Sequence, residues 1–142
     1  MTRQLIFGAL MWGTCCYALW RGSRSERIAS VSILVNVYLS LLVMQPFATR
    51  FRHVEVPIMM VDVGLFAVLL LISLRSEKFW PLWLTAMQGL GTLSHLAPLV
   101  PHVIPWAYGN AVAMWMYPML IVLGVSTHRL HRDRQAHRHS TA

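Results

Sequence analysis

A long apolar stretch near the middle of the chain, "IMMVDVGLFAVLLLISL" at residues 58–74, decides the fold class. Apart from Asp62, this stretch contains no charged residue. A run of this length and composition is typical of a helix that crosses a membrane. A charge near the middle of such a helix costs about 2.5 kcal/mol or more. We therefore expect that Asp62 is paired with another residue, is protonated, or has a functional role that offsets this cost.

The composition of the whole chain agrees with a membrane protein. Of its 142 residues, 56% are hydrophobic and 12% are charged, whereas soluble domains carry about 25% charged residues. The formal net charge is +7, and the basic residues stand between apolar runs. This pattern favours anionic lipid headgroups over nucleic acid as the partner. We expect no specific nucleic-acid binding.

Five apolar segments predict an all-α, polytopic integral membrane protein. The predicted spans are about residues 5–20, 28–47, 56–74, 79–100 and 105–127. The first is short, so a signal peptide followed by four spans is the alternative. The basic "RGSRSER" after this segment and the lack of a small-residue cleavage site favour a retained helix. Residues 128–142 form a basic, His- and Arg-rich tail that we expect to be disordered.

The loop charges predict an orientation. With five spans, nine Lys and Arg residues fall on one side of the membrane and three, Arg3, Arg50 and Arg52, on the other. We expect the protein to lie in a bacterial inner membrane, and the positive-inside rule then places the N-terminus outside and the C-terminus in the cytoplasm. The tail is expected to bind anionic headgroups through four residues: Arg129, Arg132, Arg134 and Arg138.

Polar residues inside the spans group by depth when a helical rise of about 1.5 Å per residue is counted from the cytoplasmic ends. Asp62 then lies at roughly 18 Å and His95 at roughly 24 Å. The predicted ligand or proton pathway has an upper layer of Asp62, His95, Asn110 and Ser40 with Tyr108 just above it, and a lower layer of Asn36 and Gln88.

Asp62 has two explanations at this stage. It fixes helix packing through a hydrogen bond, or it handles a proton, an ion or a ligand, as intramembrane acids often do. It is either ionised and paired or protonated and neutral, since burial disfavours the charged form of a carboxyl group. His95 is likewise either a packing residue or a ligand. The intramembrane amides fit interhelical hydrogen bonding equally well.

Metal and cofactor sites are not predicted. No second histidine shares the depth of His95 within a span, which argues against a bis-histidine haem. The run Met114, Met116 and Met119 has thioethers that favour Cu(I), but the first two point about 200° apart on a helix. Cys15 and Cys16 are adjacent, so their geometry disfavours a disulfide. We expect no resident metal or cofactor.

The sequence contains no Gly-rich phosphate loop, no HExxH motif and no paired carboxylates. It therefore predicts a small multi-pass protein that is non-enzymatic and that transports or binds a ligand through the polar layer around Asp62. An accessory or assembly subunit of a larger membrane complex, or a homo-oligomer, is the alternative. The third possibility is a membrane enzyme that acts on a lipid.

Overall fold

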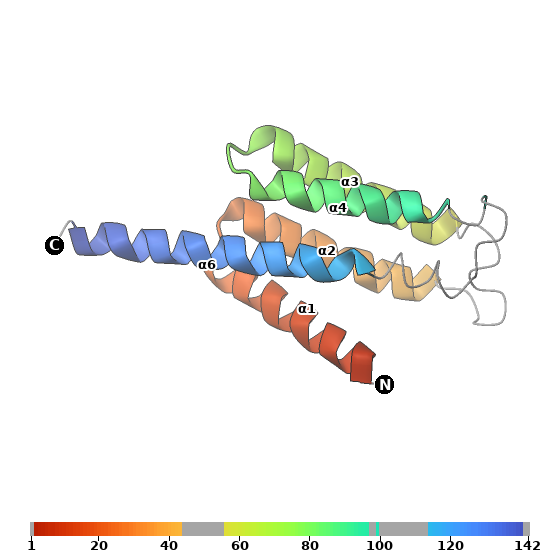
Figure 1. Ribbon diagram of the computed structural model, residues 1–142, viewed down its shortest axis with the longest axis horizontal. Helices are drawn as coiled ribbons and strands as arrows, with labels where there is room; N and C mark the ends of the chain where they lie inside the picture. Colours follow the sequence, from red (N-terminus) through yellow and green to blue (C-terminus); the bar gives the residue numbers. More distant parts are fainter. Residues whose placement is uncertain (1, 44–55, 97–98, 100–113, 141–142) are drawn as a thin grey trace.

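The structure is a computed structural model that describes residues 2–43, 56–96, 99 and 114–140. In these residues the chain forms five α-helices and no β-strand, which confirms the all-helical prediction (Figure 1). Labelled as in Figure 1, the helices are α1 (Thr2–Arg21), α2 (Arg24–Val43), α3 (Val56–Arg75), α4 (Trp80–Ser94) and α6 (Met116–Ser140). Each of the five overlaps one of the predicted spans.

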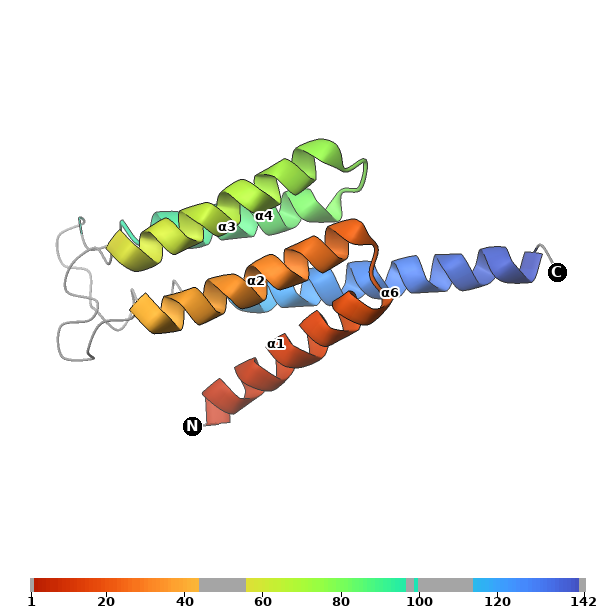
Figure 2. The ribbon, with the colours of Figure 1, turned by 180° about the vertical axis from the view of Figure 1, so that it is seen from behind.

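The helices form a ring in chain order. Helix α1 packs on α2, α2 on α3, α3 on α4 and α4 on α6, and α6 closes the ring on α1 (Figures 1 and 2). Each helix runs antiparallel to the one before it, so α1 and α6 run in the same direction. The α1/α2 turn, the α3/α4 turn and the C-terminal part of α6 therefore lie together. We call this the basic end, because it carries Arg21, Arg24, Arg75, Lys78 and Arg129.

The α1/α2 turn has a local reason to form. Ser23 and Glu26 have the spacing of a capping box, and the Ser23 backbone N–H donates to Oε2 of Glu26 at 3.1 Å. Gly22 precedes them, and a Cβ there would collide with the carbonyl oxygen of Ala18 and lie 2.7 Å from Cβ of Glu26. The turn thus requires glycine at this position, and α2 begins four residues earlier than predicted.

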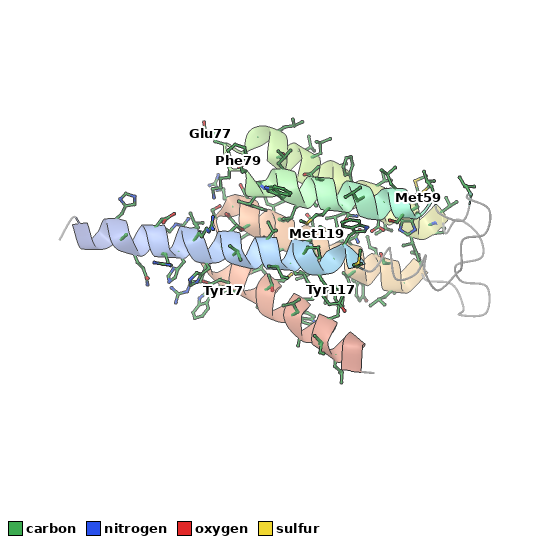
Figure 3. All side chains as sticks on the ribbon, viewed as in Figure 1. Tyr17, Met59, Glu77, Phe79, Tyr117 and Met119 are labelled. Carbon is green, nitrogen blue, oxygen red and sulfur yellow. The ribbon has the colours of Figure 1, made fainter. Side chains whose placement is uncertain are left out.

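The core lies inside the ring, and buried residues of all five helices contribute to it. Its fully buried side chains include Cys15 of α1, Leu69 of α3, Leu84 of α4 and Leu123 of α6. Close helix approach depends on a small residue at one interface, since a Cβ on Gly89 would lie 3.1 Å from the ring of Phe66. Figure 3 shows Met119 within this packed region, where it is almost completely buried.

The C-terminal tail corrects one expectation. Disorder was expected from residue 128, but α6 continues without a break to Ser140. Residues 128–142 contain no Gly or Pro, and Arg, Leu, Gln and Ala are good helix formers. The extension also contacts α1, because the Tyr17 hydroxyl lies 3.3 Å from Nδ1 of His128 and Arg21 Nη1 lies 3.4 Å from Nε2 of His131. The expectation of disorder was therefore wrong.

Two of the described helices, α2 and α3, are long and apolar enough to cross a membrane. Only 28% of the residues in the most apolar stretch of α2, and 22% in α3, are buried inside the molecule. The core helix of a water-soluble protein would be mostly buried, whereas here large side chains such as Leu39 and Leu71 face outwards. These features support a membrane location. The five-span bundle remains a prediction.

Candidate functional site: a buried carboxylate and imidazole pair

Asp62 is the centre of a polar cluster between α2, α3 and α4. Its Oδ2 lies 2.7 Å from Nε2 of His95, and its Oδ1 accepts a hydrogen bond from Nδ2 of Asn36 at 3.0 Å. Asp62 is 8% exposed, Asn36 4% and His95 2%, so the three side chains meet inside the bundle. Each carboxylate oxygen therefore has one hydrogen-bonding partner, and each partner comes from a different helix.

Gln88 ties the backbone of α3 into the same cluster. Its Nε2 donates to the main-chain carbonyl oxygen of Asp62 at 3.2 Å, and the side chain is buried. Helical carbonyl groups point towards the C-terminus, so this contact lies on the side of Asp62 that faces the basic end. Helix α4 thus holds Asp62 from two positions, Gln88 at its backbone and His95 at its carboxylate.

His95 is placed by the end of α4. It is the C-cap residue, with φ −65° and ψ −18°, and its N–H bonds the carbonyl of Thr92 at 3.1 Å. This i→i−3 bond tightens the last turn of the helix. If Asp62 is ionised, its carboxylate only accepts hydrogen bonds, and Nε2 of His95 is then the donor in the contact between them.

The pair can exist in two charge states. With a neutral imidazole, Asp62 and His95 together carry one negative charge, and with a protonated imidazole they carry none. One proton separates the two states, and the 2.7 Å contact joins the two side chains between which it would be shared. Within the described residues, no third His, Cys, Asp or Glu joins them in a group that could hold a metal ion. The arrangement is chemically suited to proton exchange or to binding a small cation.

Asn36 leaves one buried acceptor unused. Its Oδ1 has no donor in the part of the chain that the structure describes. The amide cannot be turned over, because its oxygen would then face the acceptor-only carboxylate of Asp62. A buried carbonyl without a donor costs about 1–3 kcal/mol. Oδ1 is therefore an acceptor beside the acid, available to a proton donor or a cation.

The predicted site residues divide into three groups. The structure brings together Asp62, His95, Asn36 and Gln88. Ser40 is half-buried one turn beyond Asn36, and no hydrogen bond joins it to Asp62. Asn110 and Tyr108 lie outside the described residues. The role of the set as a ligand or proton pathway remains a prediction.

The structure does not keep the two predicted layers apart, because Asn36 and Gln88 both contact Asp62. The capping box starts α2 at Arg24 rather than at residue 28. Counted from there, Asn36 lies at roughly 18 Å, close to the roughly 20 Å of Asp62 counted from the end of α3. Gln88 sits lower, and its side chain reaches the downward-facing carbonyl of Asp62.

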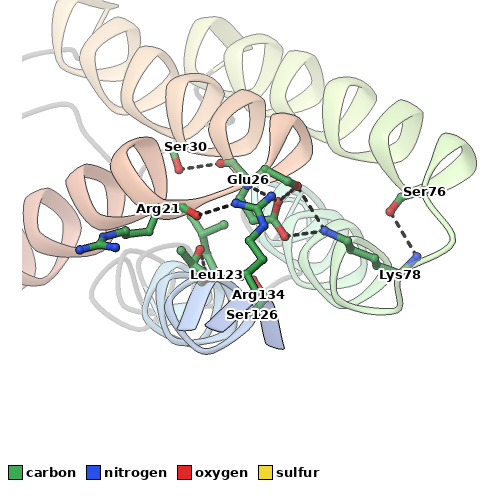
Figure 4. A network of polar contacts seen from close by, with 10 residues as sticks. Arg21, Glu26, Ser30, Ser76, Lys78, Leu123, Ser126 and Arg134 are labelled. Carbon is green, nitrogen blue, oxygen red and sulfur yellow. Dashed lines mark hydrogen bonds and ion pairs between the residues drawn. The ribbon is translucent and has the colours of Figure 1, made fainter. Parts of the chain in front are cut away.

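A second buried acid, which sequence reasoning missed, lies at the basic end (Figure 4). Glu26 is fully buried, and its Oε1 lies 3.0 Å from Nζ of Lys78 in the α3/α4 turn. The same Lys78 Nζ lies 3.2 Å from Oγ of Ser23, which is also bonded to Glu26. Arg134 of α6 reaches this region and donates to the carbonyl of Arg21 at 3.5 Å. The S-x-x-E spacing of Ser23 and Glu26 was the available signal.

The methionine run does not form a site in the described residues. Met114 is exposed, whereas Met119 is buried in the core beside Leu120 and Leu123. Met114 and Met119 therefore lie in different environments, and the burial of Met119 is explained by core packing.

Comparison of the chain with protein-family models, with curated protein sequences and with solved structures gives no match in any of the three. The functional argument accordingly depends on the geometry of the site.

Proposed function

We propose that the protein is a small multi-pass bundle of the bacterial inner membrane that binds or transports a proton or a small monovalent cation at the Asp62–His95 pair. The contact of 2.7 Å between the buried carboxylate and the imidazole is the observation that carries the proposal. In this proposal all five helices span the bilayer, and the basic end faces the cytoplasm, as the positive-inside rule requires.

Three features support this function over simple packing. An imidazole is the side chain best suited to gaining and losing a proton near neutral pH. The unused Oδ1 of Asn36 supplies an oxygen beside the carboxylate, and such oxygens are the ligands of hard cations. The cluster also lies between three helices, and each of them contributes one of its side chains.

The test is a flux measurement on purified protein in liposomes that contain the pH indicator pyranine. An imposed pH gradient should drive faster proton entry with the wild-type protein than with empty liposomes. Asp62→Asn keeps the side-chain shape and removes the carboxylate that pairs with His95, so we expect it to abolish the additional flux. Glu77→Gln, which removes an exposed acid in the α3/α4 turn, is the matched control and should retain it.

Sodium flux, followed with ²²Na⁺ in the same liposomes, distinguishes a proton site from a cation site. Wild-type flux of either ion that survives Asp62→Asn unchanged would contradict the proposal. Failure of the wild-type protein to conduct protons or Na⁺, together with an imidazole of His95 whose ¹⁵N NMR signals do not move between pH 5 and pH 8, would also contradict it.

One observation favours the alternative of a subunit or homo-oligomer. Ala9 and Gly13 are exposed on α1, and a Cβ built on Gly8 or Gly13 meets nothing within 4 Å. Small residues on an open helix face allow another helix to approach closely. Helix α1 also diverges from α2 towards its N-terminus (Figures 1 and 2). Gly13→Leu should disrupt such an assembly, which size-exclusion chromatography with light scattering would detect.

A further inference from the structure

A groove lies between α4 and α6 at the basic end, away from the Asp62 cluster. Its volume is about 520 Å³, within the usual range of small-ligand sites, and it is open along one side. Its lining residues come from the start of α4, the middle of α6 and the α3/α4 turn. Figure 3 labels Phe79 of this turn, where the groove reaches the end of the bundle.

The floor of the groove is apolar. It is formed by Trp80 and Trp83 of α4 and by Ile121 and Val125 of α6. Trp83, Ile121 and Val125 are also exposed to the outside of the bundle. An apolar floor that continues onto an apolar outer surface suits an acyl chain, and tryptophan is enriched at the level where lipid chains meet headgroups.

The rim carries charges of both signs. Lys78 and Glu26 are paired with each other at 3.0 Å, so they are already balanced. Arg129 and Asp133 stand one turn apart on α6, and both are exposed. In the described part of the chain, neither Arg129 nor Asp133 forms an ion pair. The rim thus offers one unpaired cation and one unpaired anion above an apolar floor.

We propose that this groove binds a phospholipid with a zwitterionic headgroup that bears a primary ammonium, as in phosphatidylethanolamine. The phosphate is held by the guanidinium of Arg129, which is suited to bind phosphate oxygens in pairs. The ammonium is held by the carboxylate of Asp133, and one acyl chain lies over Trp83 and Val125. An anionic headgroup without an ammonium would leave Asp133 beside a phosphate.

The proposal rests on the membrane location in the proposed function but not on the role of Asp62. The two can therefore fail separately, because lipid retention and ion flux are measured in different assays. A protein that retains the lipid and conducts no ion would support the groove alone, and the reverse result would contradict the groove alone.

The experiment is native mass spectrometry of the full chain released from detergent, after addition of one lipid at a time. Phosphatidylethanolamine, phosphatidylglycerol and diacylglycerol with identical acyl chains are compared. We expect the wild type to bind phosphatidylethanolamine about tenfold more tightly than the other two, as one well-placed charged contact allows. Binding of all three with equal affinity, or tighter binding of phosphatidylglycerol, would overturn the proposal.

Variants of the rim sharpen the test. Arg129→Gln should weaken the binding of phosphatidylethanolamine about tenfold, whereas Arg75→Gln, which removes an exposed arginine of the basic end outside the groove, should not. Asp133→Asn should abolish the preference for phosphatidylethanolamine over phosphatidylglycerol. Equal losses in Arg129→Gln and Arg75→Gln would show that the bound lipid responds only to overall charge, which would contradict a built site.

Discussion

Among the residues that the structure describes, two carboxylates are buried, Glu26 at the basic end and Asp62 within the helices, and their hydrogen-bonding partners differ in kind. Glu26 accepts a hydrogen bond from the backbone N–H of Ser23, three residues earlier, and forms an ion pair with Lys78, whose ammonium group balances its charge. Asp62 contacts Asn36 of α2 and His95 at the end of α4, and the imidazole of His95 is charged only when it is protonated. The first arrangement stabilises a turn, whereas the second joins three helices and leaves one charge dependent on a proton.

The largest effect is expected at the interhelical acid. Asp62→Leu removes the acceptor of the buried Asn36 Nδ2 and the carboxylate partner of His95, so we expect a loss of about 3 kcal/mol or more in the free energy of unfolding. Asp62→Asn retains one acceptor and should cost about 1 kcal/mol. Thermal unfolding in detergent measures both. Equal stability of the Leu and Asn variants would contradict the interhelical role.

Removal of the Lys78 ammonium group at the basic end should lower the free energy of unfolding by a smaller amount. Lys78→Met leaves Glu26 with the contacts from Ser23, and we expect a loss of about 2 kcal/mol, since the lysine is partly exposed. Adding Glu26→Gln should recover part of this loss, because the buried charge is then gone. The double-mutant cycle measures the coupling between the two side chains. Strict additivity of the two changes would contradict the ion pair.

The turn beside Glu26 gives a third comparison. A Cβ at Gly22 meets the carbonyl of Ala18 and Cβ of Glu26, so Gly22→Ala should destabilise the protein by about 1–2 kcal/mol. Gly13→Ala is the matched control, because a Cβ there meets nothing within 4 Å and alanine favours the helix. Thermal unfolding in detergent should therefore show a lower stability for Gly22→Ala than for Gly13→Ala. Similar stability for both variants would show that the turn does not depend on a missing side chain.

The smallest effect is expected at Ser40, which tests the boundary of the Asp62 cluster. Because no hydrogen bond joins Ser40 to Asp62, Ser40→Ala should change the free energy of unfolding by less than about 0.5 kcal/mol. Asn36→Ala, one turn earlier on α2, should cost at least about 1 kcal/mol. A loss at Ser40 as large as that at Asn36 would extend the cluster towards the end of α2.

The sequence predicted the helices well because long apolar runs leave few alternatives. It also predicted that Asp62 and His95 meet, since depth along antiparallel helices follows from the residue count. The predicted depth of Asn36 is too low because α2 begins at Arg24, after the capping box of Ser23 and Glu26, one turn before the apolar run that starts at residue 28. The helix boundary, rather than the polarity of the residue, caused that error.

Other features could not be predicted from one sequence. The ion pair between Lys78 and Glu26 joins two turns that are 52 residues apart, and only the packing of the ring brings them together. The groove between α4 and α6 likewise depends on how those helices pack. The helical extension of α6 agrees with its lack of Gly and Pro, whereas its polar composition is equally typical of a disordered tail.

The closure of the ring in chain order bears on how the protein is made. Asn36 precedes Asp62 by 26 residues, and His95 follows it by 33. During synthesis Asp62 can therefore contact Asn36 as soon as α3 has been made, but it can contact His95 only after α4 has been made. Nascent chains that stop before residue 95 would carry Asp62 into the proposed bilayer without that imidazole. Truncated products should therefore insert less well than complete ones.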